Sequence, residues 1–342
     1  MRPDLSRIPS LVSTSVRSLS NQAVVRLHMV VVAMLCIATV SGCSSGSEPA
    51  MPVSADNPIE VVATTSMIAD LVRVIGGPFV KVKGLMGPNV DPHLYKASEG
   101  DVSAMTKAQL VFYNGLHLEG KMVDIFEQMT SRGLEVHAVT EVFESSELLE
   151  SDYFAGNHDP HFWFDVVMWE KVAGRVAGIL STFDPVHEAT YTSNLIAYQS
   201  DLDSLNAWIH VQIESLDPEK RVLVTSHDAF GYFGRAYGIE VFGLQGLSTA
   251  TEAGTADVQA MASLVAERKI PAMFVESSIS PRGIEAVRAA VRDRGFDVQI
   301  GGTLFGDALG SPGTGAETYL GMVRANVNTF VNAMSNGKPG SN

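Results

Sequence analysis

Short runs of apolar, mostly β-branched residues alternate with helical spacing in the first part of the chain. Runs of this length are typical of buried strands, and apolar positions spaced by three and four are typical of helices. The strands are predicted at residues 59–65, 79–86, 109–115 and 134–140, and the helices at 67–75, 98–108, 120–129 and 169–180. Ser66 is the expected cap of the first helix. This order predicts a parallel sheet covered by helices, in a lobe spanning 58–183.

The longest helical pattern follows at residues 184–217. No Gly or Pro interrupts it between Val186 and Leu216. A helix of roughly 30 residues is about 45 Å long, which is more than one small domain covers. We therefore expect a single rigid helix that joins two lobes.

The alternation of strands and helices starts again after this helix. Strands are predicted at residues 221–227, 239–246, 272–277 and 296–302, and helices at 228–237, 256–269, 281–294 and 314–334. The pattern predicts a second α/β lobe at 218–342. The expected fold class is therefore α/β, with two parallel-sheet lobes, one long connecting helix and a binding cleft between the lobes.

The first 42 residues have the pattern of a signal peptide. Four arginines stand against a single acidic residue, and an apolar run over 30–40 ends at Val40-Ser41-Gly42-Cys43. The run is too short for a membrane span, and its end resembles a bacterial lipoprotein box. We expect lipid attachment at Cys43, a flexible tether over 43–57 and an extracytoplasmic protein on the membrane. Ordinary secretion with an incidental cysteine is the alternative.

The composition of the chain limits which metal ligands and partners are possible. The only cysteines are Cys36 and Cys43, so the chain after the predicted cleavage site has neither a disulfide nor a thiolate metal ligand. The net charge of −14 disfavours nucleic acid as a partner. We expect a monomer.

The triplet Asp-Pro-His occurs twice, at 91–93 and at 159–161. Proline fixes its own φ and extends the residue before it, so each triplet predicts a stiff corner that presents an imidazole. Two such corners suggest two ligands of one metal ion. The alternative is that each histidine is an ordinary polar residue of a turn.

Strand ends add two further candidates. Ligands of open α/β sheets bind beyond the carboxyl ends of the strands, and His93, His161, His227 and Asp307 all follow predicted strands. The tight strand-to-helix turn at His227 fixes its imidazole. Three imidazoles and a carboxylate suit Zn(II) or Mn(II), and four protein ligands close a tetrahedral shell. The set therefore favours holding a metal over using it in catalysis.

The remaining histidines have simpler interpretations. His137 lies within a strand pattern, and His187 and His210 are expected to be solvated on the connecting helix. His158 forms an H-x-x-H pair with His161, but the proline between them argues against a regular helix and against ligation. Two further residues stay open. His117 is a residue near the cleft, and Glu276 is expected to form a structural hydrogen bond, with the orientation of a ligand as the alternative.

Seven blocks of sequence together resemble one family. They are DPHLYKAS, YNGLHLEGKM, DPHFWFDV, SHDAFGYFGRAYGI, GLQGLSTATEAGTADV, FVESSISPR and GGTLFGDALG. In this order they look like the zinc- and manganese-binding lipoproteins that serve ABC importers. The resemblance implies two α/β lobes bridged by a rigid helix, with Zn(II) or Mn(II) held by His93, His161, His227 and Asp307. It also implies delivery of the metal to an ABC permease and its ATPase.

Two positions depart from the family pattern. Zinc-dedicated members often carry a His-rich loop before the second corner, whereas the acidic stretch 141–159 offers only His158. Many members have an acid where this chain has Lys96. The first departure weakens a zinc-only assignment.

Two other function classes compete with a metal receptor. A metal-dependent hydrolase would need an open coordination position and an adjacent base, and no H-E-x-x-H motif occurs. A surface adhesin of the same fold has no specific support in the sequence. We therefore expect a binding protein and not an enzyme.

Overall fold

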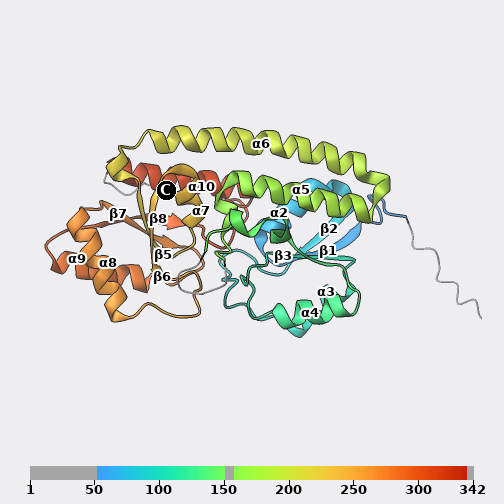
Figure 1. The fold of residues 1–342 in the computed structure, drawn as a ribbon, viewed down its shortest axis with the longest axis horizontal. Helices are drawn as coiled ribbons and strands as arrows, with labels where there is room; N and C mark the ends of the chain where they lie inside the picture. Colours follow the sequence, from blue (N-terminus) through green and yellow to red (C-terminus); the bar gives the residue numbers. More distant parts are fainter. Residues whose placement is uncertain (1–51, 151–157, 337–342) are drawn as a thin grey trace, which may run out of the picture. The chain divides into compact units, whose positions relative to one another are not determined.

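The structure is a computed structural model in which residues 52–150 and 158–336 are described (Figure 1). The predicted signal peptide, Cys43 and most of the predicted tether lie outside the described residues. Backbone contacts join Val53–Asn342 into one unit, so the lobe boundaries at 183/184 and 217/218 stay predictions.

The first lobe contains a four-stranded parallel sheet in the order β2-β1-β3-β4. Its strands are β1 Ile59–Ala63, β2 Val80–Gly84, β3 Leu110–Tyr113 and β4 Val136–Ala138, and its helices are α2 Ser66–Gly76, α3 Glu99–Lys107 and α4 Val123–Ser131. Alternate side chains of β1 enter opposite cores: Val61 packs with α2, whereas Val62 packs with α3 and α4. The helices therefore cover both faces of the sheet, as the sequence predicts.

The cap of α2 differs from the prediction. The helix begins one residue earlier than expected, so Thr65 is its N-cap and the Thr65 hydroxyl accepts a hydrogen bond from the amide of Ile68 at 3.3 Å. The hydroxyl of Ser66 instead accepts a hydrogen bond from the amide of Leu309 at 2.8 Å. Ser66 thus ties the first helix to the last loop of the chain.

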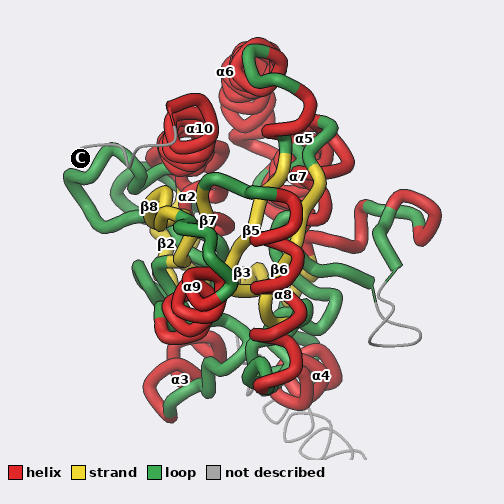
Figure 2. The backbone as a smooth tube through the Cα atoms, turned by 90° about the vertical axis from the view of Figure 1, so that its left-hand side faces the viewer, coloured by secondary structure: helices red, strands yellow, loops and turns green. Residues whose placement is uncertain are grey.

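The predicted connecting helix is present as α6, Glu188–Glu214, with 27 residues. At 1.5 Å per residue it is about 40 Å long. It packs against α2 and α5 (Val166–Phe183) and also against the last helix, α10 (Tyr319–Asn336) (Figure 1, Figure 2). One continuous helix therefore contacts elements from both ends of the chain.

The prediction for His187 was wrong, whereas His210 is exposed on α6 as expected. His187 lies in a 3₁₀ turn that precedes the helix, Pro185–His187, because the proline starts a separate turn. Its ring stacks on Phe79 with centroids 3.8 Å apart, and its Nδ1 lies 2.7 Å from a carboxylate oxygen of Asp184.

The second lobe contains two parallel pairs of strands, β5-β6 and β7-β8, where the sequence predicted one sheet. Its strands are β5 Val222–His227, β6 Glu240–Gln245, β7 Ala272–Glu276 and β8 Gln299–Leu304, and its other helices are α7 Gly231–Tyr237, α8 Thr255–Arg268 and α9 Arg282–Asp293. β5 and β7 are neighbours without a shared ladder. The α/β fold class with parallel strands is confirmed.

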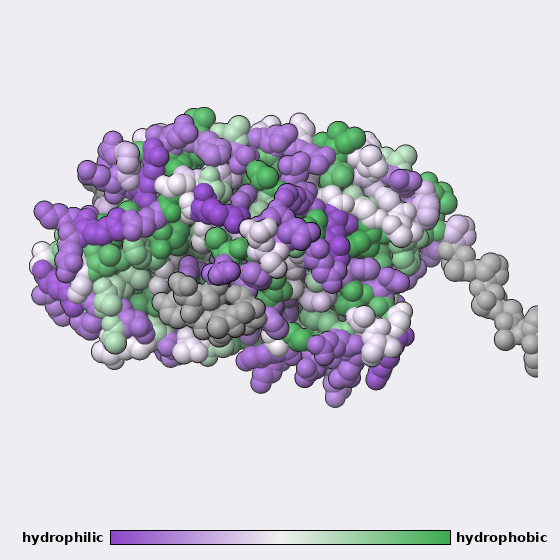
Figure 3. All heavy atoms as spheres, viewed as in Figure 1, coloured by the Kyte–Doolittle hydropathy of each residue, from purple (hydrophilic) through white to green (hydrophobic). Residues whose placement is uncertain are grey.

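Polar and apolar side chains are mixed on the surface of the protein seen in Figure 3. Figure 3 shows hydrophilic side chains spread over the face in view, with apolar ones scattered among them. On α6 the exposed apolar residues include Ile196 and Val211, at 62% and 64% exposure. Among the described residues no helix is long and apolar enough to cross a membrane.

The packing of α6 yields a stability prediction. Ile209 is 0% exposed and Ile196 is 62% exposed, and both lie on α6. Replacing either isoleucine with alanine changes the helix propensity equally, so a difference in stability between the two variants measures the effect of burial. We expect Ile209→Ala to lower the free energy of unfolding by about 2–5 kcal/mol because it leaves a cavity. Ile196→Ala should change it by no more than about 0.5 kcal/mol. Urea unfolding followed by circular dichroism measures both, and equal losses would contradict the packing described for α6.

Candidate functional site

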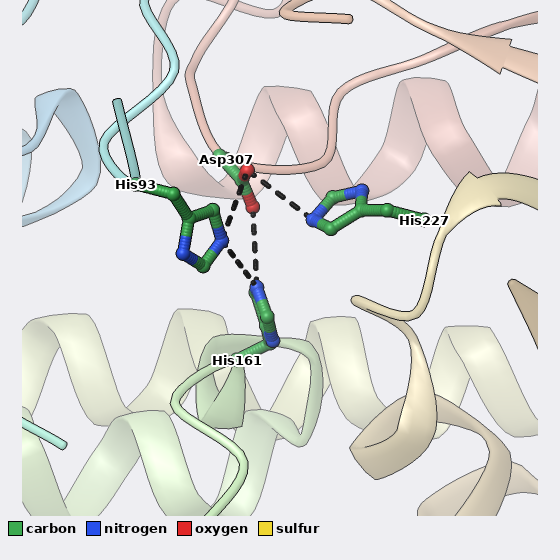
Figure 4. Close-up of side chains that lie close together, drawn as sticks. All are labelled: His93, His161, His227 and Asp307. Carbon is green, nitrogen blue, oxygen red and sulfur yellow. Dashed lines mark hydrogen bonds and ion pairs between the residues drawn. The ribbon is translucent and has the colours of Figure 1, made fainter. Parts of the chain in front are cut away.

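Four polar side chains from separate parts of the chain meet in the interior of the protein (Figure 4). His93 follows β2, His161 follows β4, His227 ends β5 and Asp307 follows β8. One nitrogen or oxygen of each lies within 4.8 Å of those of the others. All four residues are buried, with exposures of 6%, 0%, 0% and 2% in the order His93, His161, His227 and Asp307. The structure therefore brings together the four residues that the strand-end rule selected.

The distances within this group have the scale of one coordination shell. Nε2 of His93 lies 3.2 Å from Nε2 of His161. Asp307 carboxylate oxygens lie 3.7, 3.6 and 3.3 Å from the Nε2 atoms of His93, His161 and His227. A tetrahedral zinc site with bonds of about 2.0–2.1 Å puts its ligand atoms about 3.3–3.4 Å apart. The side chains converge on a space of the size that such an ion fills.

The two Asp-Pro-His triplets form the same backbone turn. The carboxylate of Asp91 accepts a hydrogen bond from the amide of His93 at 2.8 Å, and that of Asp159 accepts one from the amide of His161 at 2.9 Å. Aspartate commonly closes such turns by bonding the backbone two residues further on. The aspartates therefore fix the corners. The sequence analysis missed this role, although an Asp at the same distance before both histidines was the signal for it.

The rings of the two corner histidines are held differently. Nδ1 of His161 lies 2.7 Å from Oδ1 of Asp159, so the carboxylate orients the ring and leaves Nε2 to face the group. Nδ1 of His93 has no hydrogen-bond partner among the described residues. The free oxygen of Asp91 accepts a hydrogen bond from the hydroxyl of Thr249 at 2.6 Å instead.

His227 is fixed by Glu276 at the end of β7. One oxygen of Glu276 accepts a hydrogen bond from the amide of His227 at 2.9 Å, and the other lies 2.8 Å from Nδ1 of the ring. Both roles considered for Glu276 are therefore present, since one oxygen forms the expected structural hydrogen bond to the backbone and the other faces the ring of a predicted ligand. Gly306 leaves room for it, since a Cβ there would lie 2.2 Å from the glutamate oxygen.

Burial and neighbouring charges shift the pKa values of Asp307, His93 and His227. Burial alone would raise the pKa of Asp307, but the neighbouring His227, His161 and His93 lower it, so the carboxylate stays ionised. Neither of its oxygens receives a well-formed hydrogen bond from the described residues. Burial lowers the pKa of His93 to about 3 against the attraction of Asp307, so its ring is neutral and retains a lone pair. Burial also lowers the pKa of His227, but Glu276 and Asp307 raise it well above its usual value.

The remaining histidines do not join the group. His117 is exposed and His158 is half-buried, and both line a separate cavity of about 830 Å³ in the first lobe. Nε2 of His137 lies 3.2 Å from the carboxylate of Glu135. This cavity is therefore separate from the four-residue site, whose members are all buried.

Comparison with known proteins gives a family match over most of the chain. The model of the family "Zinc-uptake complex component A periplasmic" matches residues 61–333. "Zinc-binding protein TroA" of Treponema pallidum is 49% identical over 282 residues, which are 82% of this chain and 91% of that protein. "Manganese-binding lipoprotein MntA" of Bacillus subtilis is 43% identical over 295 residues, which are 86% and 95% of the two chains.

A solved structure supports the same relationship. The periplasmic zinc-binding protein TroA of Treponema pallidum superposes with a TM-score of 0.79 at 48% identity, over 81% of this chain and 99% of that one. The resemblance inferred from the seven sequence blocks is confirmed. The chain belongs to the family of periplasmic zinc-uptake components, which includes zinc- and manganese-binding proteins of ABC transporters.

Proposed function

We propose that this protein is an extracytoplasmic metal receptor. It binds Zn(II) or Mn(II) through His93, His161, His227 and Asp307 and hands the ion to an ABC permease powered by an ATPase. The observation that carries the proposal is a buried, ionised carboxylate to which no described residue donates a well-formed hydrogen bond, faced by three Nε2 atoms. A buried charge of this kind is costly unless a counter-charge is present, and a divalent cation supplies one.

The donor set favours holding the ion. Four protein donors fill a tetrahedral shell, whereas a catalytic zinc site keeps a position for water. Imidazole and carboxylate donors accept both zinc and manganese, and zinc is the tighter binder in the Irving–Williams order. The named relatives include proteins for each metal. Both ions are therefore proposed as cargo. The alternative function is a metal-dependent hydrolase, and hydrolytic turnover by the zinc-loaded protein would support it.

The location and assembly are proposed from the sequence and the relatives. Relatives named as lipoproteins support lipid attachment at Cys43, which lies outside the described residues. The protein would then act as a monomer anchored to the outer side of a cell membrane, close to its permease.

Removal of single donors tests the ligand set. We expect His93→Ala, His161→Ala, His227→Ala and Asp307→Ala each to lose stoichiometric metal, because each leaves only three donors and Asp307→Ala also removes the one carboxylate of the group. Elemental analysis after gel filtration measures the occupancy. Saturating metal should also stabilise the wild type by about 2.7 kcal/mol at a hundredfold excess over Kd, and the variants by much less.

His158→Ala is the matched control, since this histidine lies close to His161 in sequence but outside the group. It should retain full occupancy. Full occupancy in His161→Ala would show that the ligand set is wrong, and hydrolytic turnover that disappears in His227→Ala would replace the receptor by an enzyme.

Glu276 gives a second test at the level of ring orientation. Glu276→Gln places an amide where a carboxylate faces Nδ1 of His227, so the ring loses its charged acceptor. We expect metal affinity to fall by about 10–100-fold, as is usual for such outer partners. Competition with a chromogenic chelator measures it. Glu119→Gln is the control, because Glu119 is equally buried but bonds Thr64 and Asn114 and no member of the group. Equal losses in both variants would show a general effect of removing a buried charge.

The anchor is tested separately from the metal site. Cys43→Ser should release the protein from the membrane fraction into the soluble extracytoplasmic fraction, because no thiol remains to be acylated. Fractionation with immunoblotting measures this, and metal occupancy serves as the control that should not change. A variant that stays on the membrane to the same extent as wild type would rule out Cys43 as the anchor.

A further inference from the structure

A single carboxylate links one corner of the site to the second lobe. Oδ1 of Asp91 accepts the hydrogen bond from the amide of His93 at 2.8 Å, and Oδ2 accepts that from the hydroxyl of Thr249 at 2.6 Å. Thr249 lies in the connection between β6 and α8 and is 7% exposed. The position of the His93 corner is therefore coupled to a loop of the other half of the protein.

The second corner is not coupled in this way. The carboxylate of Asp159 holds both the amide and the ring of His161. Its link to the second half uses the backbone instead, since the hydroxyl of Tyr232 donates to the carbonyl oxygen of Asp159 at 2.9 Å. His161 thus keeps its ring orientation from within its own corner, whereas no carboxylate among the described residues holds Nδ1 of His93, whose ring meets Asp307 only through Nε2.

The His93 corner is also the side of the site nearest to open space. His93 is the most exposed of the four residues, and the next residue, Leu94, is 46% exposed. Asp91, Leu94 and Thr249 line a cavity of about 340 Å³. His227 is held by two contacts from Glu276, and His161 by two from Asp159. Of the three imidazoles, His93 therefore has the fewest supporting contacts, and residues on both sides of it in the chain, Asp91 and Leu94, line a cavity.

We propose that the hydrogen bond between Thr249 and Asp91 is a clasp that keeps His93 on the bound ion, and that its opening is the first step of metal release. This inference rests on the proposed function, since it concerns the same four ligands. Thr249 is a positioning residue that acts through Asp91 and does not touch the ion. When the clasp opens, His93 swings toward the cavity while the other three donors stay in place.

Thr249→Val tests the clasp because it keeps the shape of the side chain and removes the hydroxyl. A hydrogen bond to a charged acceptor in such a place changes an equilibrium by about 10–100-fold. We expect the dissociation rate of Zn(II) to rise by about that factor and the association rate to change by less than threefold. Stopped-flow mixing of zinc-loaded protein with an excess of a chromogenic chelator measures the dissociation rate.

Three comparisons distinguish a clasp from general damage to the loop. Thr249→Ser retains the hydroxyl and should restore a rate close to wild type. Thr251→Val alters an exposed threonine of the same loop and should have no effect. Thr249→Ala removes the hydroxyl by a smaller side chain and should release zinc as fast as Thr249→Val. Fast release from Thr249→Ser, or wild-type rates in both Thr249→Val and Thr249→Ala, would overturn the proposal.

Tyr232→Phe provides the matched comparison at the other corner. It removes the hydroxyl that bonds Asp159, yet the carboxylate of Asp159 still holds the ring of His161. Zinc should leave this variant more slowly than it leaves Thr249→Val. Equal acceleration in the two would mean that any contact between the lobes controls release, and the clasp would be refuted. Failure of the wild type to take up zinc or manganese would instead refute the proposed function itself.

Discussion

The carboxylate of Asp307 is the interaction on which the rest of the site depends. It is buried, its pKa is lowered by three imidazoles, and no well-formed hydrogen bond from the described residues reaches its oxygens. An ionised group in that position destabilises the fold by several kcal/mol unless a counter-charge accompanies it. Three imidazoles surround this carboxylate. Those of His161 and His227 are held in position by Asp159 and Glu276. Three imidazoles and one carboxylate arranged in this way suit a divalent cation.

The long helix α6 and several side-chain hydrogen bonds connect the two halves of the chain. Helix α6 packs against helices from both ends, and side-chain bonds cross the joint near the site. The amide of Tyr319 donates to Asp70 at 2.8 Å, the Tyr319 hydroxyl donates to the carbonyl of Trp163 at 2.7 Å, and the Trp163 indole donates to the carbonyl of Gly306 at 3.1 Å. Such contacts restrict hinge motion. A local movement of the His93 corner therefore requires less free energy than separation of the two halves.

Much of the fold and the site was predictable from local patterns. The strands and the long helix have clear periodicity, and the rule about strand ends selected His93, His161, His227 and Asp307 without knowledge of distances. Features that depend on contacts far apart in sequence were not predictable. Thr65 and Ser66 are equally good caps, and only the position of Leu309 decides between them. The bond from Thr249 to Asp91 and the split of the second sheet into two pairs likewise depend on tertiary packing.

The distribution of the four donors over separate strand ends has a consequence for biogenesis. No two of them are neighbours in sequence, and they are contributed by connections in both halves of the chain. A partly folded chain offers at most the two imidazoles of the first half, or one imidazole and one carboxylate of the second, and the full set exists only after both halves have formed and docked. Occupancy by metal thus reports completed folding.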